Sequence, residues 1–396
     1  MPPAEPVPAE QAKVNTLLLG GIVSMSPLAI DICLPAISAI ADAMNREEGV
    51  AQYIISFYLV GFAVGHLVWG SVSDRFGRLF ALRIGIAGFL VTSIVAAFTL
   101  SFEIMLGARL LQGVCGGVSP VVGRAIARDV AEGPHTARLM ATLTSIVGFT
   151  PLLAPIIGGA LLTVFPWQSV FVFMVAFALL CTVGAWFFLP ETNRQMDATA
   201  LNPARILSNL RRFFSLRQCR YGLALAAIPG AGFISVITGG GPILMEHFGL
   251  SALQFGWVFA FGAGSFVLGS LVTRRLVVHR SVGVMVRWGV TATVLAGALE
   301  VWCALQPQTP LWLFWFATSV FFFGYGFLMP NGTAIASEPI ADMAGLGIAL
   351  LGFIQMASAA VVSLLAATFY SGDHRSVAAL LAIAGLATGL VWWRGK

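Results

Sequence analysis

The chain has 396 residues, of which 58% are hydrophobic and only 10% are charged, and its mean hydropathy is +0.90. Soluble domains carry about 25% charged residues, so this composition excludes a soluble protein and indicates an integral membrane protein. A net charge of +5 alone would suggest a nucleic-acid partner, but the distribution of the basic residues gives it another explanation.

Twelve apolar segments are long enough to cross a bilayer, which takes about 20 residues. We predict spans at 15–41, 50–72, 79–99, 104–129, 137–163, 168–189, 219–244, 252–273, 283–305, 311–334, 342–369 and 375–393. The longest break, 190–218, predicts a cytoplasmic linker between a six-helix bundle at 15–189 and a second one at 219–393. Tails at 1–14 and 394–396 flank them. The sequence therefore predicts an all-α polytopic membrane protein.

The basic residues lie mostly on one side of this arrangement. Arginines gather in the breaks on the side of both termini, whereas Arg46 and Arg375 fall in breaks on the other side and Arg109 lies within a span. Cytoplasmic loops of membrane proteins are enriched in Lys and Arg. We therefore predict cytoplasmic N- and C-termini, and attraction to anionic lipid headgroups accounts for the positive charge without nucleic acid.

The first span contains one carboxylate, Asp31, within SPLAIDICLPAISAIA at 26–41. A charged side chain at the bilayer centre costs about 3 kcal/mol on insertion scales, so such residues usually face the protein interior and serve a function. Burial favours the neutral form of a carboxyl group. We predict that Asp31 is the proton-coupling switch. The alternative is a structural carboxylate that accepts hydrogen bonds from helix termini.

The break after the second span reads GSVSDRFGR, residues 70–78. A positive-inside turn would explain its arginines but not the order of its Gly, Asp and Arg residues. The pattern resembles the signature loop of the major facilitator superfamily, and a related GSLVTR recurs at 269–274, about half a chain length later. The resemblance implies the major facilitator fold, two pseudo-symmetric bundles around a central site. We assign to a cytoplasmic gate Gly70, Asp74, Arg75, Gly77, Arg78, Arg124 and Arg128.

The fourth span carries RLLQGVCGG at 109–117, which places Arg109 and Gln112 at membrane depth. An intramembrane arginine usually faces the bundle interior and a partner. The alternative is an arginine that caps a carbonyl or extends its head toward the interface. The motif resembles the span-four motif of drug–proton antiporters, and this resemblance implies a role of Arg109 in proton coupling.

The fifth span carries GFTPLLAPIIGG at 148–159. Each proline removes a backbone hydrogen bond, and the paired glycines allow close helix packing. The segment resembles the antiporter signature that marks exporters, although Ala154 stands where many exporters have glycine. The residues we assign to this motif are Gly148, Pro151, Pro155, Gly158 and Gly159.

Together with the first span, LMPNGTAIA and GLGIALLGFIQ in the last third make the whole chain similar to the bicyclomycin-resistance and chloramphenicol/florfenicol-exporter subfamily. Cys33 replaces the tyrosine typical of that subfamily, so an aromatic contact is missing. Val23 stands where some multidrug exporters carry a second acid, so a two-carboxylate mechanism in span one is not supported.

A third ionisable residue, Glu300, lies near the outer end of span nine. Helix packing is the favoured interpretation, and a second proton-coupling site is the alternative. Few polar residues and many aromatic ones predict an apolar cavity that suits amphipathic molecules. The residues predicted to line it are Ser26, Asp31, Tyr58, Gln112, Cys115, Thr144, Phe149, Phe233, Phe261, Tyr325, Asn331, Phe353, Gln355 and Met356.

We expect a bacterial inner-membrane exporter that exchanges protons for amphipathic drugs such as phenicols or bicyclomycin. It would be a monomer surrounded by lipid, with the proton as coupling ion and with no metal, other cofactor or nucleic acid. The scattered histidines and the absence of a nucleotide-binding loop predict neither an enzyme nor ATP as energy source. Two alternatives stay open: a proton-coupled exporter of a sugar or metabolite, and a non-transporting membrane sensor or scaffold.

Overall fold

The structure is a computed structural model that describes residues 15–131, 134–193, 196–200, 202–306 and 308–395. Within this part of the chain, twelve helical segments are long and apolar enough to cross a membrane, as the sequence predicted, and the regular elements are all helices. The spans of the N-terminal half contain α1 (Thr16–Asp31), η1 (Leu34–Ala36), α2 (Ile37–Ala43), α3 (Glu48–Ala51), α4 (Tyr53–Phe76), α5 (Arg78–Phe98), α6 (Phe102–Gly116), α7 (Val118–Asp129), α8 (Pro134–Leu162) and α9 (Gln168–Phe187).

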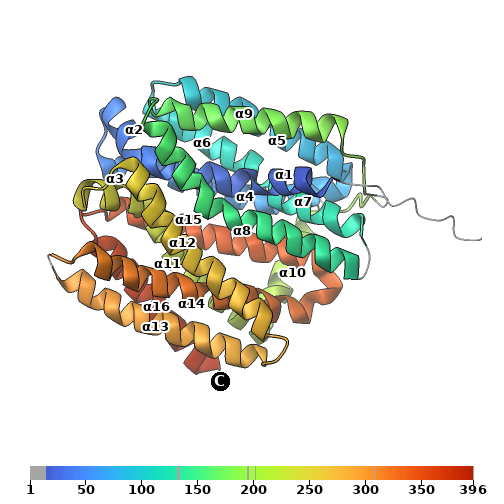
Figure 1. The fold of residues 1–396 in the computed structure, drawn as a ribbon. Helices are drawn as coiled ribbons and strands as arrows, with labels where there is room; N and C mark the ends of the chain where they lie inside the picture. The colour runs from blue at the N-terminus through green and yellow to red at the C-terminus, as the bar shows by residue number, and fades with distance from the viewer. Residues whose placement is uncertain (1–14, 132–133, 194–195, 201, 307, 396) are drawn as a thin grey trace, which may run out of the picture.

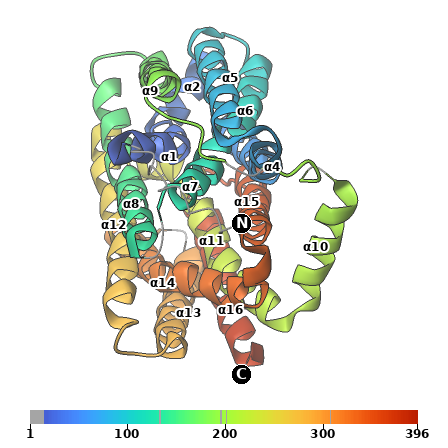
Figure 2. The same ribbon diagram turned by 90° about the vertical axis from the view of Figure 1, so that its right-hand side faces the viewer.

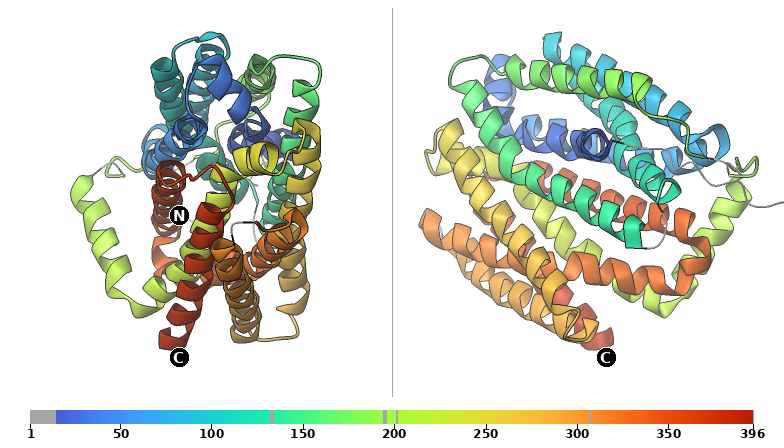
Figure 3. Two further views of the ribbon diagram at one scale, coloured as in Figure 1. Left: turned by 90° about the vertical axis from the view of Figure 1, so that its left-hand side faces the viewer. Right: turned by 45° about the vertical axis from the view of Figure 1, so that its right-hand side comes forward.

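The linker contains one further helix, α10 (Pro203–Ser215). The spans of the C-terminal half contain α11 (Arg217–Pro242), η2 (Ile243–His247), α12 (Ala252–Leu276), α13 (Val282–Leu305), α14 (Leu311–Ser337), η3 (Glu338–Met343), α15 (Ala344–Thr368) and α16 (Arg375–Gly395). Figure 1 shows the two halves as adjoining bundles, the first blue to green and the second yellow to red. Figures 2 and 3 show α10 standing to one side of both bundles.

Two helix pairs form most of the contact between the halves: α4 packs on α15, and α8 packs on α12. The short helix η1 also touches α11 and α12. The chain crosses twelve times between the start of α1 and the end of α16. Because this number is even, both points lie at the same end of the molecule. We call this the terminal end and the other, where η1 and η2 lie, the distal end.

Several spans change direction where their sequence interrupts the helix. In span one, helix α1 stops at Asp31, and Pro35 lies in the following η1 turn. Proline has no N–H to donate and so favours such breaks. Span four is divided at Gly117 between α6 and α7. Both breaks position groups of the candidate site.

Glycine allows α4 and α6 to approach more closely than other residues would. A Cβ atom at Gly61 would lie 1.9 Å from the carbonyl oxygen of Leu110, and one at Gly113 would lie 2.1 Å from that of Tyr58. Small residues at helix contacts allow such packing in membranes. This contact fixes the depth of α6, and therefore of the arginine it carries.

Candidate functional site

Asp31 is the last residue of α1 and is only 3% exposed. The helix ends at this residue, so the carboxylate stands at a break in the first span rather than along a regular face. In the part of the chain that the structure describes, its carboxylate forms neither a hydrogen bond nor an ion pair. A buried carboxylate without a partner is stable only when it carries a proton or when its surroundings change.

Arg109 is completely buried on α6, and the three groups that accept hydrogen bonds from its guanidinium are uncharged. Its Nε donates to the carbonyl of Ile54 (3.2 Å), and its Nη2 to the carbonyl of Ala29 (3.2 Å). Its Nη1 donates to Oε1 of Gln112 at 2.6 Å. The guanidinium also lies 4.4 Å from the ring centroid of Tyr58, a favourable cation–π distance. Asp31 and Arg109 are both buried, yet they do not pair here.

Gln112 continues this network toward α5. Its Nε2 donates to Oγ of Ser93 at 2.7 Å, and that hydroxyl donates to the carbonyl of Phe89 at 2.6 Å. The amide therefore has its oxygen on Arg109 and its nitrogen on Ser93, which fixes its orientation. Gln112 is a predicted cavity residue, and in the structure its side chain also orients the guanidinium of Arg109.

Ser26 and Tyr58 tie α1 to α4 and α6. The Ser26 hydroxyl donates to the carbonyl of Gly116 at 2.6 Å, and the Tyr58 hydroxyl donates to the carbonyl of Ser26 at 3.3 Å. Gly116 is needed at this junction, because a Cβ atom there would lie 2.8 Å from each of the two hydroxyl oxygens. Both predicted cavity residues are fully buried, and their bonds hold α1 against α4 and α6.

The C-terminal half contributes an aromatic cluster from three helices. The Phe233 ring of α11 lies 5.4 Å from that of Tyr325 on α14 and 5.7 Å from that of Phe266 on α12, measured between centroids. Phe322 also packs against Phe233, at 4.6 Å. The predicted residues Phe233 and Tyr325 thus lie together, and the structure adds Phe266 and Phe322 to them.

Other predicted cavity residues lie on α14 and α15. Asn331 is buried and donates to the carbonyl of Phe327, whereas Gln355 donates to the Thr333 hydroxyl at 3.4 Å. Phe353 and Met356 are half-buried on α15. Thr144 is exposed on α8.

The last three predicted cavity residues are Cys115, Phe149 and Phe261. Cys115 faces Gly88 of α5, where an added Cβ would meet its sulfur at 2.6 Å, so it lies between two helices of the same half. Phe149 is 57% exposed beside Leu153, and Phe261 is 70% exposed.

Glu300 is fully buried within the C-terminal half. Its Oε1 accepts a hydrogen bond from the Thr318 hydroxyl at 3.1 Å, and its Oε2 has no partner among the residues that the structure describes. The bond joins α13 to α14, which agrees with the helix-packing interpretation.

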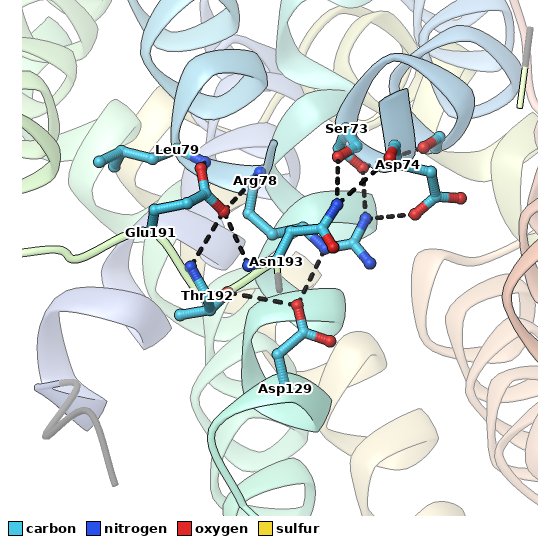
Figure 4. Close-up of polar contacts among 9 residues, drawn as sticks. Ser73, Asp74, Arg78, Leu79, Asp129, Glu191, Thr192 and Asn193 are labelled. Carbon is cyan, nitrogen blue, oxygen red and sulfur yellow. Dashed lines mark hydrogen bonds and ion pairs between the residues drawn. The ribbon is translucent and has the colours of Figure 1, made fainter. Parts of the chain in front are cut away.

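The predicted gate motif forms an ionic cluster at the terminal end (Figure 4). Arg78 pairs with Asp74 one turn before it, and its Nε donates to Oδ2 of Asp129 on α7 at 2.9 Å. Gly77 has φ 102°, a conformation that glycine adopts without strain. Arg75 is different, because its guanidinium stacks on the ring of neighbouring Phe76 at 5.3 Å.

The linker segment PETN, residues 190–193, binds this cluster, and sequence analysis missed it. The Glu191 carboxylate accepts hydrogen bonds from the backbone N–H groups of Arg78 and Leu79, each at 2.9 Å, and so caps α5. Asn193 donates to the carbonyls that end α4, and Thr192 donates to Asp129 at 3.2 Å. A carboxylate is favourable at a helix N-terminus. Glu191 is far from α5 in the sequence, so this contact could not be predicted.

The span-five motif lies at the contact between the halves. A Cβ atom at Gly158 would lie 2.4 Å from the carbonyl oxygen of Ile32, and one at Gly159 would lie 2.3 Å from that of Ala252 on α12. The Pro155 carbonyl in turn lies 2.7 Å from where a Cβ of Gly256 would be. Pro151 is half-buried one turn earlier, and Gly148 has open space beside it. The motif therefore lets α8 touch both α1 and the opposite half.

Three hydroxyl groups join the halves in the distal part of the molecule. Ser363 on α15 lies 2.7 Å from Ser56 on α4 and 2.7 Å from Thr238 on α11, measured between hydroxyl oxygens. All three residues are fully buried. We call this group the hydroxyl bridge; it holds α4 of the first half against two helices of the second.

Two further hydrogen bonds between the halves lie nearer the distal end. The hydroxyl oxygens of Tyr53 and Thr368 are 3.1 Å apart, and the Tyr370 hydroxyl donates to Glu48 at 3.2 Å. At the terminal end, by contrast, a cavity of about 290 Å³ lies among residues of α4, α7 and α15. The halves are thus joined by hydrogen bonds distally, and a cavity lies between them terminally.

The chain is similar to known proteins over most of its length. The family model described as "Major Facilitator Superfamily" matches residues 19–363. The chain belongs to this superfamily. Multidrug resistance protein D of Escherichia coli K12 is 28% identical to this superfamily member over 96% of each chain. A bicyclomycin resistance protein homolog of Haemophilus influenzae is 26% identical over 89% of this chain and 88% of that protein. The D-xylose–proton symporter has the same fold, with TM-score 0.72 and 16% identity over 96% and 99% of the chains.

Membership explains the arrangement described above. Major facilitator proteins are transporters rather than enzymes, and the twelve apolar spans with bacterial relatives make this member a multi-pass protein of the bacterial inner membrane. Its two adjoining six-span bundles match the plan of transporters that work by rocking one bundle against the other.

Proposed function

We propose that the protein is a proton-coupled antiporter that exports amphipathic drugs, such as phenicols or bicyclomycin, by alternating access. The observation that carries the proposal is Asp31, a buried carboxylate at a helix break with no cation partner among the described residues, close in depth to the buried charge of Arg109. The relatives named for multidrug and bicyclomycin resistance support drugs as the cargo.

The coupling follows from the cost of burying charge. An ionised Asp31 is tolerated when water reaches it or when Arg109 exchanges a neutral partner for it, whereas the protonated form is tolerated in a dry site. Each state of the transporter therefore has its own preferred protonation. A proton taken up from the distal side neutralises Asp31 and weakens the hold on the cargo, and its release on the terminal side restores the charge.

Arg109 contributes a permanent charge whose position is fixed by Gln112 and two backbone carbonyls. Because these partners are neutral, the guanidinium keeps its attraction for a carboxylate that approaches it. The aromatic cluster of the C-terminal half supplies the opposing apolar wall, which suits amphipathic molecules with few polar groups.

The test uses purified protein in liposomes with an imposed proton gradient and a panel of phenicols and bicyclomycin. We expect drug transport that stops when the gradient is collapsed and is lost in Asp31→Asn. The matched control is Asp42→Asn, which removes an exposed aspartate from the distal end of the same span. Transport that persists without the gradient, or full activity of Asp31→Asn, would overturn proton coupling through this residue.

A further inference from the structure

The terminal cavity contains basic groups that the transport cycle above does not use. Its walls come from α4, α5 and α7 of the first half, and Gly352 of α15 closes it from the second half. Arg124 and Arg128 line it from α7, one helical turn apart and therefore on one face. Arg124 is exposed and Arg128 is half-buried.

These two arginines differ from the third arginine of the cavity. Arg78 engages both carboxylates of the wall, Asp74 and Asp129. Neither Arg124 nor Arg128 forms a hydrogen bond or ion pair within the described residues. Like charges four residues apart on a helix repel each other. The cavity thus contains three guanidinium groups and two carboxylates, so positive charge is in excess, and both carboxylates bond to Arg78 rather than to Arg124 or Arg128.

The chemistry of such a pair selects an anion. Guanidinium groups present planar N–H forks that match carboxylate and phosphate oxygens, and an anion between them would replace their repulsion with attraction. Pro120, Val121 and Ala125 of the same helix add an apolar lining. A volume of about 290 Å³ suits a head group rather than a whole drug-sized molecule.

We propose that Arg124 and Arg128 form an anion-binding site for the carboxylate, phosphate or sulfonate head group of an amphiphile entering between the halves at the terminal end. Calling the amphiphile a cargo rests on the proposed transport function, whereas the binding site itself does not. The same head-group chemistry has two sources, a soluble amphiphile or an anionic lipid, and the experiment separates them.

The test measures binding to the full-length protein in nanodiscs of uncharged phosphatidylcholine. The probes are a dansyl-labelled undecanoate and its methyl ester, which share one tail and differ only in head-group charge. We expect the wild type to favour the carboxylate, and Arg124→Gln or Arg128→Gln to weaken carboxylate binding about tenfold each, since each removes one charge-assisted hydrogen-bond donor group. Ester binding should not change.

The double variant Arg274→Gln/Arg275→Gln is the matched control, because it removes two exposed arginines from the second half's counterpart of the gate motif. Arg124→Lys and Arg128→Lys keep the charge and should retain most of the affinity. Equal wild-type affinity for carboxylate and ester, or an equal loss in the control, would overturn the proposal.

A second series of nanodiscs contains phosphatidylglycerol. If this lipid weakens carboxylate binding in the wild type but not in Arg124→Gln, the lipid phosphate occupies the site; if it does not compete, the soluble amphiphile does, and both results support an anion site. Efflux of a neutral phenicol is measured in parallel. Loss of that efflux in Arg124→Gln with unchanged carboxylate binding would assign the arginine to gating and overturn the proposal. Carboxylate binding without any proton-driven efflux would refute the proposed function and leave the site standing.

Discussion

Replacing Ser363 by alanine tests whether the hydroxyl bridge holds the distal contact closed. The change removes the shared partner of Ser56 and Thr238, two fully buried hydroxyls that each lie 2.7 Å from it. A buried polar group that loses its partner costs about 1–3 kcal/mol. In a distally open state the same hydroxyls would meet water, so the variant should lose little there. A difference of about 1.4 kcal/mol shifts the equilibrium between the states about tenfold.

The shift can be measured as a distance between spin labels on opposite halves. Positions Ala43 at the end of α2 and Leu305 at the end of α13 are exposed distal sites, used in a background that lacks the five native cysteines. Double electron–electron resonance should show a larger population of long distances in Ser363→Ala than in the wild type.

Thr388→Ala provides the matched control, because this buried hydroxyl bonds only to the carbonyl of Ala384 within its own helix. It should leave the distance distribution unchanged. Identical distributions for Ser363→Ala and the wild type, or an equal shift in Thr388→Ala, would refute the reasoning.

Three other substitutions test contacts outside the bridge. Glu191→Ala should lower the Tm and speed proteolysis of the linker, because the α5 cap is lost at a cost of about 1 kcal/mol. Gly113→Ala should lower the free energy of unfolding by about 1–3 kcal/mol or more, because the new Cβ would lie 2.1 Å from the Tyr58 carbonyl oxygen. The Tm and the yield of folded protein should fall with it. Burial lowers the pKa of His374, whose neighbours include His247, Asp373 and Arg375. The unfolded chain therefore takes up more protons below about pH 6.5, and the Tm should fall between pH 7.5 and 5.5, less steeply in His374→Gln.

Each of these has a control and a contradicting result. Glu191→Gln should keep part of the cap, and unchanged proteolysis in Glu191→Ala would argue against capping. Gly107→Ala lies on the same helix as Gly113 with nothing within 4 Å, so equal loss in both would exclude the proposed clash. Parallel Tm–pH curves for the wild type and His374→Gln would show that this imidazole does not set the pH response.

The spans and the buried charges could be predicted from the sequence because each depends on a local cost. A hydrocarbon span needs a long apolar run, and a carboxylate or guanidinium within it is conspicuous. Asp31 and Arg109 were found in this way. The partners of Arg109 could not be predicted, because its guanidinium is held mainly by backbone carbonyls, which every residue carries.

Which side of an apolar helix is buried and which is exposed was the least predictable property. Phe149 and Phe261 lie in mostly apolar helices without a pronounced polar face, so their exposure could not be predicted from the sequence pattern. The contact of Glu191 with α5 was hidden for a different reason. The two are far apart in the sequence, and a helix cap supplied by a distant linker has no fixed spacing.

The hydroxyl bridge also bears on how easily the two halves separate. Its three members, Ser56, Ser363 and Thr238, are uncharged. Parting them exchanges hydrogen bonds between neutral groups for hydrogen bonds to water, and no ion is left stranded in the interior. Opening at these three residues should therefore be nearly indifferent to ionic strength, and it is opposed locally only by the modest net energy of neutral hydrogen bonds.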